Sequence, residues 1–205
     1  MAQELTPRNL PAQQQGASTH TIHEYECASP EEAKAIYEQA KKRLMTINSW
    51  QEYAGAGTAE FWLLNEQGQE KDGQPEKGDL FQIDIPGPGS SEGDGFDWVQ
   101  VEDIEENSVG DAELISIRVR PAQHPGHRKE GETAHFFTHD ATSNFVVSRN
   151  GLMVKAEVYG RNEVPNISEA EGLLDKARNA TIGATAAVGL SKIQWKSLVK
   201  GLIGR

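Results

Sequence analysis

Four histidines lie close together in the second half of the sequence, and imidazole is the side chain best suited to bind a metal or transfer a proton near neutral pH. His124 and His127 lie in a polar segment that contains proline, and His135 and His139 follow it. On a strand, His135 and His139 would share one face. Their spacing matches no standard zinc motif, even with Asp140 as a further ligand. We therefore predict hydrogen-bonded or solvated histidines, and neither a metal nor any other cofactor.

A second group of polar residues lies at residues 160–166, where the last predicted strand leads into the C-terminal helical region. Arg161 could bind a ligand carboxylate, and Glu163 could act as a general base in a dry pocket, with Asn162 between them. The structural alternative pairs Arg161 with Glu163 and uses the asparagines to fix the corner between strand and helix. The sequence leaves both interpretations open.

The candidate ligand-binding set combines these groups with one aromatic residue. It consists of His135, His139, Arg161, Asn162, Glu163 and Trp98. The chain contains no Gly-x-Ser-x-Gly nucleophile motif, and its single cysteine, Cys27, has only His23 near it in sequence. We therefore identify no catalytic residue, although triads are assembled in space and catalysis stays open.

Two further segments can be interpreted either as purely structural or as functional. Glu92, Asp94 and Asp97 lie in an acidic, glycine-rich loop, but the spacing of a calcium-binding EF-hand is absent, so we expect a solvated loop. Residues 182–189 are small, and on a helix they permit either close packing against a sheet or a void for a ligand.

The first 18 residues contain two prolines, four glutamines and few apolar side chains. This composition predicts a disordered leader over residues 1–18, followed by a single domain over residues 19–205. The leader has neither the basic start nor the apolar run of a secretory signal. Because the chain also has only one cysteine, we expect a cytoplasmic protein.

Two capping boxes predict the helices that would position these groups. The first, Ser29-Pro30-Glu31-Glu32, is followed by apolar residues at helical spacing and predicts a helix that ends near Asn48. The second, Ser168 with Glu171, predicts a long C-terminal helix with a kink or break near Gly189.

The hydrophobic period is two over much of the chain between these helices, which predicts strands. The predicted strands comprise residues 20–27, 61–64, 80–85, 98–104, 113–120 and 152–159. Residues 133–149 predict either one bent strand or two. The buried face of residues 98–104 is ambiguous, because Val99 and Val101 oppose Trp98 and Ile104.

The order is therefore strand, helix, about six or seven strands, then a long terminal helix. Alternating strands joined by short turns form antiparallel sheets with one covered face. We predict an α+β fold in which a curved antiparallel sheet of about seven strands is covered by an N-terminal helix and a long C-terminal helix.

This element order resembles the helix-grip fold of the START-related and birch-allergen-related superfamily, from about His20 to the end of the chain. The resemblance implies an apolar cavity between the sheet and the C-terminal helix. It also implies binding of lipids or other hydrophobic small molecules, or cyclase and aromatase-like activity. It rests on the order of elements, so it assigns no site residues.

Composition excludes several classes of protein. The chain of 205 residues has a formal net charge of -11, which disfavours nucleic acid as a partner, and no apolar run is long enough to span a bilayer. The C-terminal segment Leu190–Arg205 carries lysines every four residues beside an apolar side. It could contact a membrane surface, but we favour docking of its apolar side on the sheet.

We predict a soluble domain that binds a small hydrophobic or amphipathic ligand between the sheet and the C-terminal helix. One alternative is a cyclase- or hydrolase-type enzyme that uses His135, His139, Arg161 and Glu163 around a pocket. Another is a non-catalytic protein that binds a partner through an exposed apolar patch. The oligomeric state is left open.

Overall fold

Seven antiparallel strands form one sheet in the computed structural model, which describes residues 5–86, 90, 93–126, 133–166 and 194–205. The order across the sheet is β1-β7-β6-β5-β4-β3-β2, so both edge strands come from the N-terminal half of the chain. The strands are β1 (Ala17–Glu26), β2 (Glu60–Leu64), β3 (Leu80–Asp84), β4 (Asp97–Val109), β5 (Ala112–Pro121), β6 (Thr142–Asn150) and β7 (Met153–Glu163). The predicted antiparallel sheet of about seven strands is confirmed.

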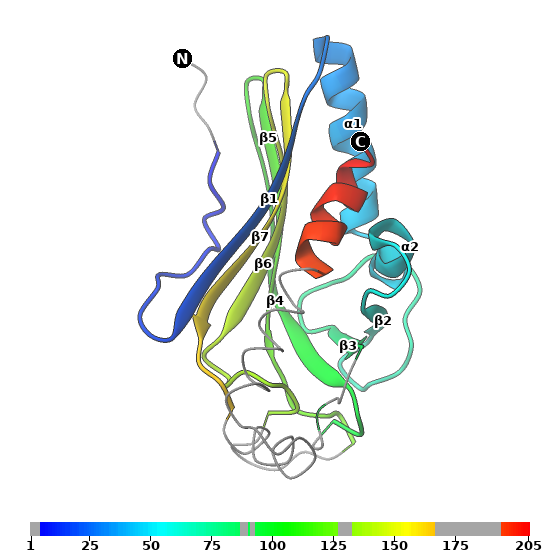
Figure 1. Ribbon diagram of the computed structural model, residues 1–205, viewed down its shortest axis with the longest axis vertical. Helices are drawn as coiled ribbons and strands as arrows, with labels where there is room; N and C mark the ends of the chain where they lie inside the picture. The colour runs from blue at the N-terminus through cyan, green and yellow to red at the C-terminus, as the bar shows by residue number, and fades with distance from the viewer. Residues whose placement is uncertain (1–4, 87–89, 91–92, 127–132, 167–193) are drawn as a thin grey trace.

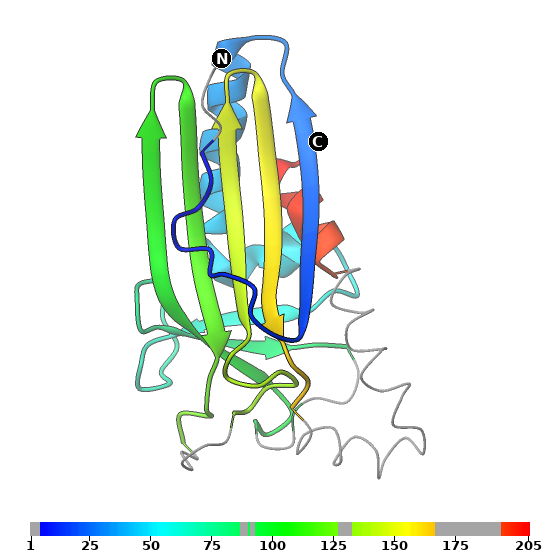
Figure 2. The same cartoon turned by 90° about the vertical axis from the view of Figure 1, so that its left-hand side faces the viewer.

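The helices cover one face of this sheet, which we call the helix face (Figure 1). They are α1 (Pro30–Leu44), the 3-10 turn η1 (Ile47–Ser49), α2 (Trp50–Ala54) and a C-terminal helix over residues 194–203. The opposite face, which we call the outer face, carries no described helix; it is turned toward the viewer in Figure 2. The predicted start of a long helix at Ser168, and the break near Gly189, lie outside the described residues.

The capping signal before α1 acts as predicted. The Ser29 hydroxyl accepts a hydrogen bond from the Glu32 N–H at 3.2 Å, and the Glu32 carboxylate reaches back to accept one from the Ala28 N–H at 2.8 Å. The helix ends at Leu44 rather than near Asn48, and η1 and α2 continue the chain. Its apolar stripe is buried against β6 and β7: Ala33, Ile36, Tyr37, Ala40 and Leu44.

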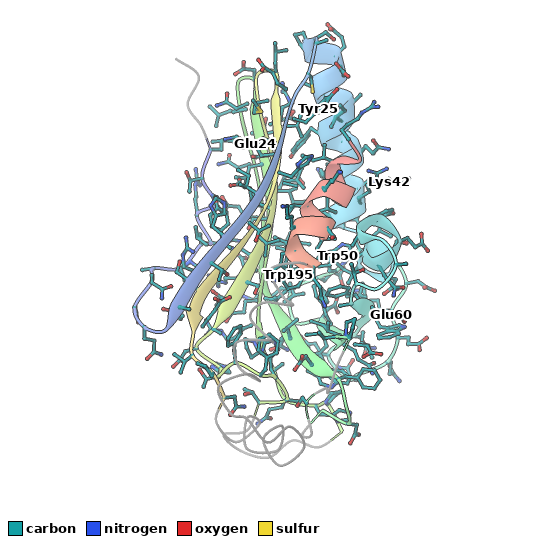
Figure 3. All side chains as sticks on the ribbon, in the orientation of Figure 1. Glu24, Tyr25, Lys42, Trp50, Glu60 and Trp195 are labelled. Carbon is teal, nitrogen blue, oxygen red and sulfur yellow. The ribbon has the colours of Figure 1, made fainter. Side chains whose placement is uncertain are left out.

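Trp50 lies at the centre of the core on the helix face (Figure 3). Its side chain is fully buried, and its ring contacts those of Phe61, Phe81 and Phe145 at centroid distances of 5.1, 5.9 and 4.7 Å. The indole N–H donates to the Leu44 carbonyl at 3.0 Å, so the only polar atom of this side chain is paired. Trp50 therefore joins α2 to three strands and to the end of α1.

The C-terminal helix packs into the same core. Leu198, Val199, Leu202 and Ile203 are buried, and Trp195 contacts the rings of two core phenylalanines (Figure 3). This arrangement matches the predicted docking of the apolar side on the sheet. No helix in the described part of the chain has the length and apolar character to span a membrane.

A β-bulge in β4 explains why the buried face of this strand was ambiguous. The pairing of β4 with β5 changes register between Val101 and Asp103, which inserts one extra residue. Val99 and Val101 lie in the main core, and the extra residue returns Ile104 to the same side. Trp98 faces the opposite way, into a second cluster on the outer face with Leu64, Leu80 and Ala134.

The segment from residue 133 to 149 contains one regular strand, which occupies only its second part. Its regular strand is β6, which begins at Thr142, and residues 133–138 form an irregular stretch before it. Within that stretch Phe137 makes one isolated bridge to Pro165, and the Thr138 N–H donates to the Val164 carbonyl at 2.9 Å. The stretch is therefore bound to the residues just after β7 by backbone contacts, which a periodic pattern of side chains does not predict.

Residues 5–16 lie across the outer face (Figure 2), and we call them the N-terminal strap. Near one end, the Glu105 carboxylate accepts hydrogen bonds from the backbone N–H groups of Arg8 and Asn9, at 2.7 and 3.1 Å. The buried Asn9 side chain accepts from the Ser116 hydroxyl and from the Asn144 amide, both at 2.9 Å. The strap is thus fixed to β4, β5 and β6.

The other end of the strap is fixed to β7. The Asn162 side-chain oxygen accepts from the N–H groups of Gln14 and Gln15, and the Asn162 N–H donates to the Gln13 side chain at 3.0 Å. The disordered leader over residues 1–18 stays a prediction, and the structure places these contacts within residues 5–16 of it. The expectation counted apolar residues, whereas the strap is fixed mainly by a few asparagine and glutamine side chains with distant partners.

Replacing Asn9 with alanine is expected to release the strap. The change would leave the buried Ser116 hydroxyl without its acceptor and would remove the shortest hydrogen bond of the Asn144 amide, at a cost of about 1–3 kcal/mol in the free energy of unfolding. Urea unfolding measures the loss, and hydrogen exchange of residues 5–16 measures release. Gln14→Ala is the control, because that exposed residue binds Asn162 through its backbone N–H. Equal effects of the two variants would contradict a specific role for Asn9.

Candidate functional site

The six predicted ligand-binding residues do not converge on one pocket. Arg161 lies on the outer face, where its guanidinium donates to the Ser18 hydroxyl at 2.9 Å and lies 5.3 Å from the centre of the Tyr159 ring. Glu163 lies on the helix face, where its carboxylate accepts from the Thr19 hydroxyl at 3.0 Å. The hypothesis that Arg161 and Glu163 act together therefore has no geometric basis.

The backbone at Asn162 separates these two neighbours. Residues two apart in a regular strand share a face, but Asn162 has φ of 55°, in the left-handed region, and the β1–β7 pairing changes register beside it. The Asn162 side chain then contacts the N-terminal strap. Asn166 likewise donates to the Thr133 and His135 carbonyls at 3.3 and 3.2 Å. Asn162 thus holds the strap and Asn166 holds the segment after β7, whereas Arg161 and Glu163, paired in the structural alternative, lie on opposite faces.

Trp98 lies on the outer face of the sheet, and His135 lies in the irregular stretch before β6. The Trp98 N–H donates to the Ala134 carbonyl at 2.8 Å, and the indole belongs to the second apolar cluster. His135 is buried, stacks on Phe136 at 4.4 Å, and accepts from the Phe137 N–H through Nδ1 at 2.9 Å. Trp98 therefore does not face the predicted pocket, and His135 has a structural contact.

His139 is exposed, and its carbonyl accepts from the Arg120 guanidinium at 2.7 Å. Metal binding by this histidine group finds no geometry in the described part of the chain, where no three His, Cys, Asp or Glu side chains come together in a group that could hold an ion. His127 and Glu92, from the proposed zinc and calcium groups, lie outside the described residues.

Burial lowers the pKa of His135 to about 3, so this histidine is neutral at neutral pH. The unfolded chain binds a proton near the ordinary pKa of about 6.5, so the folded state loses stability as the pH falls below that value. Between pH 6.5 and pH 5 the expected loss is about 2 kcal/mol.

His135→Asn is the matched variant for this prediction, because an asparagine side-chain oxygen can accept the same Phe137 N–H without titrating. Urea unfolding at pH 7 and pH 5 is expected to show a smaller pH effect in the variant, by about 2 kcal/mol. The same pH effect in both proteins would contradict the buried neutral histidine.

Glu163 is the predicted residue that the structure does bring to the helix face. It is 8% exposed, and its carboxylate lies above Gly160, where any Cβ would overlap both this carboxylate and the Thr19 hydroxyl. Ser143 pairs with Gly160 from the neighbouring strand, so a second hydroxyl flanks the position. We call Thr19, Ser143, Gly160 and Glu163 the polar end of the helix face.

The chemistry of this polar end is hydrogen-bond acceptance on an otherwise apolar surface. Further along β7, the helix face carries Val154, Ala156 and Val158, all in the main core. A carboxylate at such a place can accept hydrogen bonds from a hydroxyl or an ammonium group, and these bonds are strengthened by its charge. Thr19, Ser143 and Gly160 were not among the predicted residues. The signal that could have found them is a glycine that interrupts the alternation of β7.

No family model and no curated protein matches this chain. Among solved structures, the crystal structure of hypothetical protein jhp0584 from Helicobacter pylori aligns with a TM-score of 0.54 at 10% identity, over 97% of this chain and 95% of that one. A point mutant of norcoclaurine synthase from Thalictrum flavum, in complex with a transition state analogue, aligns with a TM-score of 0.35 at 10% identity, over 87% of this chain and 94% of that one. Ara h 8.0201 aligns with a TM-score of 0.35 at 7% identity, over 92% and 100%.

The chain has an α+β fold of the helix-grip type, so the predicted resemblance in fold is confirmed. The Helicobacter pylori protein is similar to it over nearly the whole of both chains. At this identity the likeness concerns the fold alone.

Proposed function

We propose that this protein is a non-catalytic binding domain for a small amphipathic ligand held on the helix face of the sheet. The observation that carries the proposal is the polar end, where the buried Glu163 carboxylate and the Thr19 hydroxyl interrupt an apolar surface. The ligand's apolar body would lie next to this polar end, beyond the part of the helix face that α1 and the C-terminal helix already cover. Its polar group would donate a hydrogen bond to Glu163.

The charge of the polar end selects the chemical class of the ligand. Glu163 favours a ligand that carries a hydroxyl or an ammonium group, and it disfavours a carboxylate. The formal net charge of -11 acts in the same direction, because it repels anions. Arg161, the group expected to bind a ligand carboxylate, is engaged on the outer face with Ser18.

An enzyme built on His135, His139, Arg161 and Glu163 is less well supported than a binding domain. Nδ1 of His135 already accepts a hydrogen bond, and the low pKa of that side chain removes it from proton transfer near neutral pH. His139 is exposed, and Arg161 and Glu163 lie on opposite faces of the sheet. The described geometry therefore gives these four residues no common substrate.

The proposal is tested by competition with the uncharged fluorescent dye Nile red, using the full chain and two matched probes, dodecylamine and dodecanoate. Wild-type protein is expected to bind the amine at least about tenfold more tightly than the carboxylate. Native mass spectrometry of the same mixtures gives the stoichiometry. Displacement by neither probe, or equal displacement by both, would overturn the proposal.

The variant Glu163→Gln tests whether the preference for the amine over the carboxylate arises at the polar end. The variant keeps a hydrogen-bond acceptor and the side-chain volume but removes the charge, so it is expected to lose most of the preference for the amine. Glu24→Gln is the control, because Glu24 is a half-exposed residue of β1 that pairs with Lys155. An unchanged preference in Glu163→Gln, or an equal loss in both variants, would exclude the polar end as the binding site.

A further inference from the structure

The strand β1 forms an open edge of the sheet. It pairs with β7 on one side and is last in the strand order, so in the described structure no strand lies on its other side. Its residues are half-exposed or exposed along the full length, and Ile22 is 41% exposed, one of few large apolar side chains at the surface. The unpaired backbone groups of such an edge can pair with another strand.

The backbone groups that point outward can be assigned from one hydrogen bond. The Cys27 N–H donates to the Leu152 carbonyl at 2.9 Å, and the pairing of β1 with β7 continues in register from that point. Because hydrogen-bonded and non-hydrogen-bonded residues alternate, the residues with even numbers direct their N–H and C=O groups away from β7. These residues are His20, Ile22, Glu24 and Glu26.

The opposite edge of the sheet, at β2, already has hydrogen-bond partners on its free side. Among the described strands, β1 is therefore the edge that can accept a further strand. On the free side of β2, the Lys71 N–H donates to the Leu63 carbonyl at 2.9 Å, and the Asn48 side chain accepts from the Leu63 N–H at 2.7 Å. Leu64 also forms a bridge with Glu70. By contrast, β1 contains neither proline nor lysine, the residues that commonly protect an edge strand.

We propose that β1 is an interaction surface for a second copy of this chain, and that the two β1 strands pair antiparallel about Ile22. In this register Ile22 lies opposite its own copy, and His20 lies opposite Glu24 of the partner subunit. The sequence around Ile22 is thus self-complementary, as a two-fold interface requires. The two sheets would join into one continuous sheet across the dimer.

Charge complementarity on the outer face supports a second copy over other partners. Glu24 pairs with Lys155 at 2.9 Å, and the His20 ring binds Glu157 at 2.9 Å (Glu24 and the helix-face residue Tyr25 point to opposite sides in Figure 3). In the proposed dimer, the Lys155–Glu24 pair of one subunit lies next to the equivalent of the His20–Glu157 pair in the other subunit. Lysine, glutamate, histidine and glutamate then follow one another across the junction, and complementary polar side chains in facing positions stabilise strand pairs.

Analytical ultracentrifugation of the full chain over a range of concentrations tests the proposal, with the expectation of a reversible dimer. Ile22→Lys is expected to weaken the association at least about tenfold, because like charges would then face one another at the two-fold axis. Val109→Lys is the control, since Val109 is 53% exposed but lies at the end of β4 away from the open edge. A monomer at all concentrations, or equal effects of both variants, would overturn the proposal.

A charge-reversal pair separates the proposed register from any other dimer. His20→Glu should weaken self-association because it places two carboxylates opposite one another, and Glu24→Lys should weaken it because it removes the carboxylate that faces His20. An equimolar mixture of the two should recover association, because the glutamate introduced in one variant would face the lysine introduced in the other. Thermal unfolding of each variant checks that it folds. Failure of the mixture to associate more tightly than either variant alone would exclude this register.

Discussion

Trp50→Ala is expected to reduce the free energy of unfolding by about 4 kcal/mol, since replacing a buried tryptophan removes its contacts and leaves a cavity. Trp50 is fully buried and touches the rings of Phe61, Phe81 and Phe145. The variant also leaves the Leu44 carbonyl without the indole donor. Urea unfolding followed by circular dichroism measures the loss.

Trp62→Ala is the control for this prediction. Trp62 is the neighbour of Phe61 in β2, but it is half-buried on the outer face and makes an edge contact with Phe96 at 6.0 Å. Its loss should cost under about 2 kcal/mol, because less apolar area is returned to water. Losses of equal size would mean that the core is not centred on Trp50.

Glu113→Ala is expected to cost about 3 kcal/mol, because it leaves a nearly buried cation without its carboxylate. Arg149 binds Glu113 through Nε at 2.8 Å, with side chains that are 10% and 13% exposed, and Lys34 of α1 binds the same carboxylate. The pair therefore links β5, β6 and α1. Glu38→Ala, which removes the half-exposed second partner of Lys34, should cost about 0.5 kcal/mol or less.

The pH dependence of these variants gives a second measurement. Burial raises the pKa of Glu113, but hydrogen bonds from Lys34 and Arg149 outweigh it and hold the pKa below its ordinary value. A carboxyl with a lowered folded-state pKa contributes stability above its unfolded pKa, near about 4.3, and this contribution disappears as the pH falls through the folded value. The difference between wild type and Glu113→Ala should therefore shrink below about pH 4. A constant difference down to about pH 2 would contradict this origin.

The predictions that were confirmed rest on local patterns. The capping residues of α1 and its apolar stripe act within a few residues of one another, so the sequence alone locates this helix. The alternation in β5 likewise places Ile115, Ile117 and Val119 in the core, as expected for a strand with one buried face. Such patterns predict the fold class before any long-range contact is known.

The features that the sequence did not reveal depend on single residues that change the alternation or act at a distance. The bulge after Val101 hides the orientation of Trp98, and the left-handed backbone at Asn162 places Arg161 and Glu163 on opposite faces. The contacts of Asn9 reach across more than a hundred positions of sequence, and no periodicity predicts them. For these reasons the sequence predicted one residue of the polar end, Glu163, and missed its neighbours.

The strap also determines the order in which contacts break when the N-terminus is pulled. Because residues 5–16 cross several strands instead of running alongside one, a force applied at the N-terminus loads their attachments one after another, first at Arg8 and Asn9 and then at Gln14. The strands beneath them are loaded only when β1 itself begins to peel from β7. Pulling on that end therefore breaks the hydrogen bonds of the strap before those of the sheet. The strap thus protects the sheet from small forces applied at the N-terminus.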